Sequence, residues 1–196
     1  MSEQKGDSAM SVNYCVTCGA PMEKRTIDGV ERRACTAEAC GAVHWGNYSI
    51  GVGALVRRNG QILLVRRAQE PGKGNWTIPG GYIEQLEPIG ETVVREVLEE
   101  TGVQSSVVGI VALRDQPRSV HNVYIAFEME YISGEPVPDG VEVDAAGFFS
   151  LEEQRTMKVA GFTEWLIDAA LNKKSDGMRK DELQVAPGSA NEFYRL

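Results

Sequence analysis

The chain has 196 residues, of which 42% are hydrophobic and 24% charged, and its formal net charge is −8. This length accommodates one domain of ordinary size with a small appendage, and the acidic charge argues against a surface that coats nucleic acid. No stretch is apolar for long enough to span a membrane, and residues 1–11 lack the apolar core of a secretory signal, so the sequence predicts a cytoplasmic protein without a membrane segment.

All four cysteines lie in the first forty residues, and their spacing is informative. Two residues separate Cys15 from Cys18, and four separate Cys35 from Cys40. Two such pairs are typical of a structural zinc site with four thiolate ligands, which leaves no open position for water. His44 is an alternative ligand because the second pair has the wider spacing, whereas two disulfides are disfavoured in a cytosolic compartment. The sequence therefore predicts Zn²⁺ bound by the four cysteines.

Residues 23–34, between the two cysteine pairs, are predicted to form a short β-hairpin with Asp28-Gly29 as its two-residue turn. A segment this small has no core of its own, so we expect it to need the metal in order to fold. Residues 43–49 are predicted to follow as a linker that contains a turn at Gly46-Asn47.

The rest of the chain alternates between strand-like and helix-like patterns. Strands are predicted over residues 50–56, 61–67, 104–113, 121–132 and 146–149. Asn59-Gly60 is a hairpin turn between the first two strands. Ser150 and Glu153 have the spacing of a capping box, which predicts a helix start, and a further helix is predicted over residues 162–171. Strands on both sides of a central helix predict a mixed α/β domain.

The segment from Gly80 to Val103 contains that central helix and organises the chain. Pro88 suits the first helical position, and Gly102 suits the C-terminal cap. Three carboxylates share one face of the helix at positions i, i+3 and i+4, namely Glu96, Glu99 and Glu100. Like charges this close repel each other, and hard divalent cations such as Mg²⁺ would offset the repulsion because they prefer oxygen ligands. A solvated acidic face is the alternative interpretation.

The same segment resembles the signature of the Nudix hydrolases. Its fixed positions are filled by Gly81, Glu87, Arg95-Glu96-Val97, Glu99-Glu100 and Gly102-Val103. The resemblance implies an α/β/α sandwich with a mixed sheet, in which the signature forms a loop, a helix and a loop. It also implies that Mg²⁺ or Mn²⁺ supports the attack of water on a phosphorus of a nucleoside diphosphate linked to another moiety.

The order of a zinc ribbon followed directly by such a domain is similar to the domain order of the Nudix subgroup that includes NADH, ADP-ribose and FAD pyrophosphatases. Composition, cysteine spacing and the resemblance together predict a disordered N-terminus over 1–11, a zinc ribbon over 12–46, a Nudix domain over 47–172 and a polar, partly disordered C-terminal tail over 173–196.

The resemblance also assigns roles to individual residues. The expected ligands of Mg²⁺ are Glu96, Glu99 and Glu100, together with the backbone carbonyl of Gly80. Arg95 is expected to orient Glu96 or to pair with Glu87, and not to contact the substrate. In some members of the family the general base is the glutamate that corresponds to Glu96.

In other members the general base is a glutamate on a distant loop or strand, and the candidates here are Glu130 and Glu142. Three residues are candidates for contacts with the substrate, namely Arg66, Trp76 and Tyr82. A core position is an equally good interpretation of Trp76.

The expected substrate is ADP-ribose, FAD, NADH or a related compound, and the expected product is a nucleoside monophosphate. A further pattern of the NADH-preferring members is not found, which favours ADP-ribose or FAD. One alternative is an enzyme that removes damaged nucleoside triphosphates. Another is a non-catalytic nucleotide sensor, whose zinc ribbon binds a partner or nucleic acid through the basic residues Lys24, Arg25, Arg32 and Arg33. The expected partners are a nucleotide and, in a homodimer, a second copy of the chain.

Overall fold

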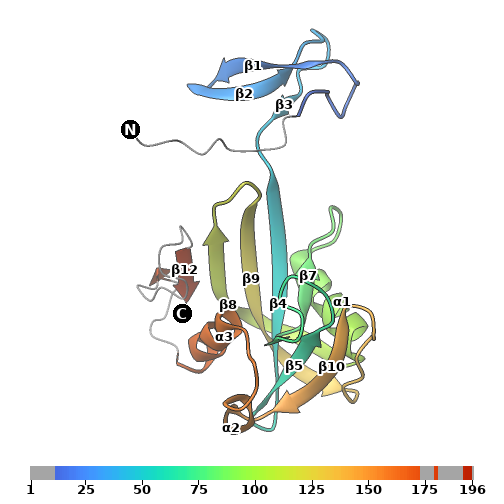
Figure 1. The fold of residues 1–196 in the computed structure, drawn as a ribbon, viewed down its shortest axis with the longest axis vertical. Helices are drawn as coiled ribbons and strands as arrows, with labels where there is room; N and C mark the ends of the chain where they lie inside the picture. The colour runs from blue at the N-terminus through green and yellow to red at the C-terminus, as the bar shows by residue number, and fades with distance from the viewer. Residues whose placement is uncertain (1–11, 173–178, 181–191, 196) are drawn as a thin grey trace. The chain divides into compact units, whose positions relative to one another are not determined.

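The computed structural model describes residues 12–172, 179–180 and 192–195. The chain divides into two compact units, each of which is described by itself. The first unit comprises Met1–Tyr48 and Arg118–His121, and the second comprises Ser49–Pro117 and Asn122–Leu196. Figure 1 shows the elements of both units in chain order. The disorder predicted for residues 1–11 lies outside the described residues.

The first unit contains a small antiparallel sheet of three strands, in the order β1 (Met22–Ile27), β2 (Val30–Cys35) and β3 (Val43–His44). Asp28 and Gly29 have φ angles of 50° and 79°, which the two-residue turn between β1 and β2 requires, and the predicted hairpin is confirmed. The buried core of this unit consists of Cys15, Met22 and Cys35. So small an apolar core contributes little to stability by itself.

The described strands of the second unit form one sheet in the order β10-β5-β4-β9-β8-β12-β11, with β6 paired to β5 and β7 paired to β4. The strands are β4 (Tyr48–Arg58), β5 (Gln61–Arg67), β6 (Trp76–Thr77), β7 (Gly80–Tyr82), β8 (Gln104–Gln116), β9 (His121–Ser133), β10 (Val143–Phe149), β11 (Arg179–Lys180) and β12 (Glu192–Arg195). The described helices are α1 (Ile89–Thr101), α2 (Leu151–Gln154) and α3 (Gly161–Leu171). Each of the five predicted strands lies within one of the observed strands.

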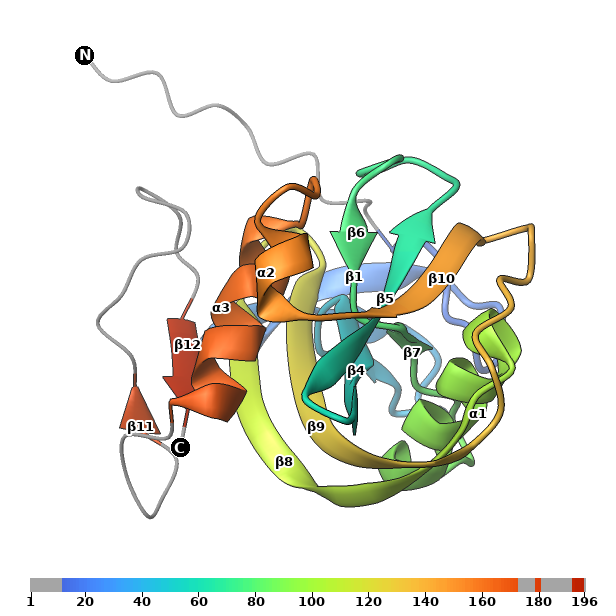
Figure 2. The same cartoon turned by 90° about the horizontal axis from the view of Figure 1, so that it is seen from below.

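Helices cover both faces of the sheet. Figure 2 shows α1 on one side of the central strands and α2 and α3 on the other. Along β4, Ala54 and Val56 belong to the buried cluster that contains Val93 and Val97 of α1, whereas Leu55 belongs to the cluster that contains α3 residues. Successive strand residues point to opposite faces, so a strand buried on both faces is apolar throughout. The architecture is the predicted α/β/α sandwich.

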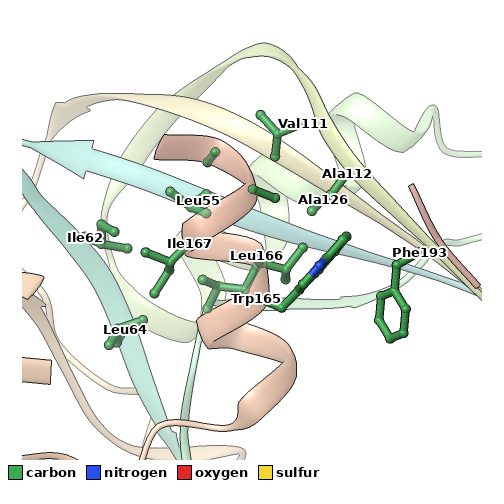
Figure 3. Close-up of a cluster of buried hydrophobic side chains, with 13 residues drawn as sticks. Leu55, Ile62, Leu64, Val111, Ala112, Ala126, Trp165, Leu166, Ile167 and Phe193 are labelled. Carbon is green, nitrogen blue, oxygen red and sulfur yellow. The ribbon is translucent and has the colours of Figure 1, made fainter. Parts of the chain in front are cut away.

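The cluster beneath α3 is shown in Figure 3. Leu166 and Ile167 of α3 are buried together with Leu64 of β5. The ring of Trp165 lies 4.8 Å from the ring of Phe193, which comes from β12 near the end of the chain. This contact attaches a segment that is distant in sequence to the core of the second unit.

Strand β12 differs from the polar tail expected over residues 173–196. It pairs antiparallel with β8, and Phe193 and Arg195 are 4% and 3% exposed. Arg195 Nη1 donates a hydrogen bond of 2.6 Å to Asp168 of α3. A four-residue strand is too short to show a periodic pattern in the sequence. Its stability comes instead from its contacts with β8 and α3. The other residues predicted as tail, apart from β11, lie outside the described chain.

The helix α2 begins at the predicted capping box. Ser150 Oγ accepts a hydrogen bond of 3.3 Å from the backbone N–H of Glu153, and the Glu153 carboxylate accepts one of 2.7 Å from the backbone N–H of Ser150. None of the helices in the described part of the chain combines the length and the apolar character that crossing a bilayer requires.

Candidate active site and metal centre

The caps and the apolar face of α1 fix the position of its glutamates. Pro88 is the N-cap, one position earlier than predicted, and Gly102 is the C-cap with a φ of 68°. The backbone N–H of Gly102 donates a hydrogen bond of 2.8 Å to the carbonyl of Leu98, as a left-handed cap does. Val93 and Val97 are fully buried against the sheet, so the rotation of the helix about its axis is set by packing.

Two glycines of β7 allow the backbone to approach these glutamates closely. The backbone N–H of Gly80 donates a hydrogen bond of 2.9 Å to Glu100 Oε2. A Cβ atom on Gly81 would lie 2.5 Å from the carboxylate of Glu96 and would push that carboxylate out of its present position. Gly80 has a φ of 157°, and a Cβ there would collide with the backbone carbonyl of Val52 in β4. These two glycines of β7 therefore allow β4, β7 and α1 to come close together.

Arg95 joins three carboxylates, two of α1 and one of the loop before it. Its Nε and Nη2 donate hydrogen bonds of 3.0 and 2.9 Å to Glu87. Its Nη1 donates hydrogen bonds of 2.9 Å each to Glu96 and Glu99. The Arg95 guanidinium holds the pKa of the Glu87 carboxyl below its usual range. Arg95 thus contacts both Glu87 and Glu96, the two partners that the sequence predicts for it.

The carboxylates on the side facing β7 are partly desolvated. Burial raises the pKa of Glu100 to about 8, despite the Gly80 N–H, and the carboxylates of Glu96, Glu142 and Asp139 raise it further. Burial also raises the pKa of Glu96, against the opposing effect of Arg95. Several carboxylates that face one another in a partly buried place are suited to a divalent cation, which would offset their charge.

The three predicted metal ligands are not equivalent. Glu96 and Glu100 face Gly81 and Gly80, whereas the side chain of Glu99 is 59% exposed and turned to Arg95. Within the described chain these glutamates do not form a group whose carboxylate oxygens all lie within 4.8 Å of one another. Arg95 holds Glu96 and Glu99, and the Gly80 N–H holds Glu100, so a bound cation would draw the carboxylates closer together.

The loop between β9 and β10 brings further carboxylates toward the site. Glu142 is exposed on this loop, and its charge acts on both Glu96 and Glu100. Asp139 accepts hydrogen bonds from the backbone N–H groups of Val141, Glu142 and Val143 and so shapes the loop. Asp139 is absent from the predicted site residues, although Asp139-Gly140 is a turn signal.

Glu130, the other candidate base, is an exposed residue of β9 opposite Ser106 of β8. It is not among the residues that line the pocket beside Glu100. Of the two distant candidates, Glu142 is therefore the one whose charge reaches the glutamates of α1.

A pocket of about 380 Å³ opens beside Glu100. Arg67 lines it, whereas the predicted Arg66 points to the other face of β5 and donates a hydrogen bond of 2.6 Å to Asp144. Trp76 also lies outside the lining, because its ring packs edge-on against Phe149 at 4.9 Å in the core. Tyr82 lines the pocket, as expected.

An arginine and two aromatic rings also line the pocket. The guanidinium of Arg114 lies 4.1 Å from the ring centre of Phe162 and 5.4 Å from that of Tyr124. Arg114 Nη2 donates a hydrogen bond of 2.9 Å to Asn122 Oδ1, which fixes its direction. Burial raises the pKa of Tyr124, so its hydroxyl stays protonated. Arg114 lies one residue beyond the strand predicted over 104–113, and the pairing of β8 with β9 continues the strand through it.

The four cysteines of the first unit form a separate metal centre. Their sulfur atoms all lie within 4.8 Å of one another, and the Cys18–Cys35 and Cys15–Cys40 sulfurs are 3.5 and 3.7 Å apart. Tetrahedral zinc at 2.3 Å from each sulfur would separate the sulfurs by about 3.8 Å, so the cluster fits Zn²⁺.

The backbone around the first pair favours a thiolate. The backbone N–H groups of Thr17 and Cys18 lower the pKa of Cys15 to about 6. All four cysteines are free of disulfides. His44 lies in β3 opposite Arg33 and is not part of the cluster.

Comparisons with known proteins agree with this geometry. A family profile described as NUDIX domain matches residues 47–166. The NAD-capped RNA hydrolase NudC of Stutzerimonas stutzeri (strain A1501) is 32% identical over 139 residues, which are 71% of this chain and 48% of that protein. The ADP-ribose pyrophosphatase of Methanocaldococcus jannaschii is 34% identical over 106 residues, which are 53% of this chain and 62% of that protein. The chain spans less than two thirds of the length of either relative.

Solved structures extend the likeness of the fold. A crystal structure of a NUDIX hydrolase from Nitrosomonas europaea has a TM-score of 0.68 and 23% identity, and the match covers 83% of this chain and 95% of that one. A MutT NUDIX hydrolase from Burkholderia pseudomallei has a TM-score of 0.56 and 28% identity, with 62% and 97% of the two chains covered. The match to the Nitrosomonas structure includes most of this chain, so the sandwich described above is a fold already known for such hydrolases.

Proposed function

Because this chain belongs to the NUDIX domain family, we propose that it hydrolyses the diphosphate bond of a nucleoside diphosphate linked to another moiety, with Mg²⁺ or Mn²⁺ as cofactor. The substrate is of the ADP-ribose, FAD or NADH type, and a nucleoside monophosphate is released. The relatives named as an ADP-ribose pyrophosphatase and an NAD-capped RNA hydrolase support this class of substrate.

The proposal rests on one observation. Glu100 and Glu96 face Gly80 and Gly81 of β7, beside a pocket that cationic side chains also line. Glu100 is 7% exposed and lines the pocket together with Arg67 and Arg114. Carboxylates are suited to the metal, and guanidinium groups are suited to the negative charge of a diphosphate. The two kinds of charge therefore line one cavity.

The residues of the chain take separate roles in this mechanism. A bound divalent cation supplies Lewis acidity and a more acidic water. Glu96 and Glu100 hold the cation, and Arg95 orients Glu96. Glu142, which lies on an exposed loop close enough to act on both glutamates, accepts the proton of the attacking water.

The arginines and aromatic rings that line the pocket bind the remainder of the substrate. Arg67 and Arg114 balance the charge that spreads over the phosphate oxygens, and their fixed positions reduce the reorganisation needed during the reaction. The rings of Tyr124 and Phe162 offer flat apolar surfaces for a base or another planar group.

The first unit has a metal site of its own, formed by its four cysteines. We propose that Cys15, Cys18, Cys35 and Cys40 bind one Zn²⁺ as a structural ion, because their four sulfur atoms all lie within 4.8 Å of one another and a closed set of four thiolates is typical of structural zinc. The zinc takes no part in hydrolysis.

A panel of substrates tests the enzymatic proposal. The protein is incubated with Mg²⁺ and ADP-ribose, NADH, FAD, dinucleoside polyphosphates or nucleoside triphosphates, and the products are separated and identified. We expect a nucleoside monophosphate from at least one compound of the ADP-ribose, FAD or NADH type. Absence of turnover with all compounds, with Mg²⁺ or Mn²⁺ present, would refute the proposal.

The substitution Glu100→Gln tests the metal site. Glutamine keeps an oxygen that can accept the Gly80 N–H but loses the charge that binds the cation, so we expect kcat to fall by at least about a hundredfold. The matched control is Glu91→Gln, at an exposed position in the first turn of the same helix. Full activity of Glu100→Gln would remove this residue from the ligand set.

A further inference from the structure

A basic groove of about 670 Å³ lies within the first unit, and none of its lining residues has been assigned to the hydrolytic site. Four cationic side chains and one carboxylate line it, namely Lys24, Arg32, Arg33, Arg118 and Glu31. His44 and His121 also line the groove. The local charge is therefore positive although the chain as a whole has a formal net charge of −8.

The register of the small sheet aligns several of these basic residues. Lys24 of β1 lies opposite Arg33 of β2, and Arg33 lies opposite His44 of β3. Residues directly opposite each other in an antiparallel sheet share a face, so the three form a row across the strands. Arg33 is anchored by a hydrogen bond of 3.1 Å from its Nη1 to the carbonyl of Met22. Lys24 is exposed and bonds to Glu31.

Two aromatic side chains border the same groove and remain accessible. Trp45 is 53% exposed and Tyr48 is 63% exposed. The guanidinium of Arg32 lies 4.7 Å from the ring centre of Trp45, and its Nη1 donates a hydrogen bond of 3.1 Å to the Trp45 carbonyl. Gly46, with a φ of 135°, lets the Tyr48 ring fold back over the chain, because a Cβ there would lie 2.9 Å from that ring.

We propose that this groove binds single-stranded nucleic acid. The cations contact the phosphate groups, and unpaired bases stack on the rings of Trp45 and Tyr48. A positively charged groove with accessible aromatic rings is the combination that binds single strands, since every base has a flat face and every nucleotide a charge. A base-paired duplex would leave the two rings without partners. The binding does not depend on the proposed hydrolysis, since it uses other residues in another unit.

Fluorescence anisotropy with a labelled twelve-nucleotide RNA tests the proposal. The RNA has a 5′-hydroxyl group and therefore no diphosphate bond, so the result is separate from any hydrolytic activity. We expect binding that weakens by about tenfold or more in Trp45→Ala and in Lys24→Ala, because each loses a stacking surface or a phosphate contact. A DNA strand of the same sequence is measured in parallel, to show whether the groove binds RNA alone or single strands in general. Binding of either strand supports the proposal.

Two control variants match these substitutions. Tyr14→Ala removes a ring that is 68% exposed in the same unit but does not line the groove. Arg25 belongs to the basic residues that the sequence pointed to, but it lies on the other face of β1 from Lys24 and does not line the groove, so Arg25→Ala removes a neighbouring cation outside it. Both are expected to bind RNA as tightly as the unmodified protein. Zinc content and the melting temperature of every variant establish that the first unit is folded.

The dependence on salt gives a second measurement. Contacts from about three or four cations to a single strand predict a slope of about −2 to −3 for the logarithm of the association constant against the logarithm of salt concentration. The proposal is overturned if the RNA and DNA strands do not bind at 100 µM protein. It is also overturned if Tyr14→Ala and Arg25→Ala weaken binding equally, or if a duplex or an acidic phosphopeptide binds more tightly than either strand.

Discussion

At the scale of single residues, the site is held by a few polar contacts of high specificity. Arg95 joins Glu87, Glu96 and Glu99, while the Gly80 N–H holds Glu100. The spacing of the glutamates and the pairing of Arg95 with Glu87 could be predicted from the sequence, because they depend on one helix and the loop before it.

Arg95→Ala is expected to destabilise the second unit by roughly 2 kcal/mol, because the half-buried Glu87 and Glu96 carboxylates lose charged hydrogen bonds. Arg95→Lys should recover only part of this loss, since an ammonium group cannot bond in the same planar geometry. Urea unfolding followed by circular dichroism measures the difference. Arg155→Ala, at an exposed position, is the control.

The effect of Arg95→Ala depends on pH with a definite sign. The pKa of Glu87 is lowered in the folded protein, so its ion pair stabilises the fold above the unfolded pKa of about 4.3 and is lost as the pH falls through the lower, folded value. The difference between the two proteins should therefore shrink in acid. A difference that grows as the pH is lowered would contradict this assignment.

At the scale of secondary structure, predictions succeeded where a segment stabilises itself and failed where it relies on a distant partner. The hairpin of β1 and β2, the capping box of α2 and the Gly102 cap are local and were predicted. The strand β12 was not, because Phe193 gains its stability from Trp165. The entry of Arg114 into the pocket depends likewise on pairing between β8 and β9.

Phe193→Ala measures the contribution of β12. The side chain is 4% exposed and packs against α3, so its removal should lower the free energy of unfolding by about 3 to 5 kcal/mol. Val137→Ala, which shortens an exposed side chain, should change it by less than about 0.5 kcal/mol. Thermal unfolding compares the two. Equal small effects would show that β12 contributes nothing to the core.

At the scale of the whole molecule, average properties conceal local ones. The net charge of −8 correctly describes the chain but does not describe the groove in the first unit, where four cations face one carboxylate. The row of Lys24, Arg33 and His44 follows from the register of three strands, and composition contains no information about register. The pocket beside Glu100 likewise depends on strand register, because the pairing of β8 with β9 brings Arg114 and Tyr124 together in its lining.

Removal of zinc should affect the two units differently. The first unit has a buried core of Cys15, Met22 and Cys35, whereas the second has two larger apolar clusters. Thiol modification that releases the metal should therefore make residues 12–48 sensitive to protease and leave the second unit resistant. We expect about one zinc released per chain, measured with a colorimetric chelator. Metal-free protein with reduced thiols and a protease-resistant first unit would contradict the expectation.

The hydrogen bond from Gly80 to Glu100 makes one amide proton a reporter of the assembled site. This proton exchanges with deuterium in the solvent only when the bond between β7 and α1 opens, so its exchange rate gives the free energy of that opening. A cation that fixes Glu100 in place or draws it away changes this rate. A single resonance thus follows the state of the site over minutes to hours, in a protein that is turning over no substrate.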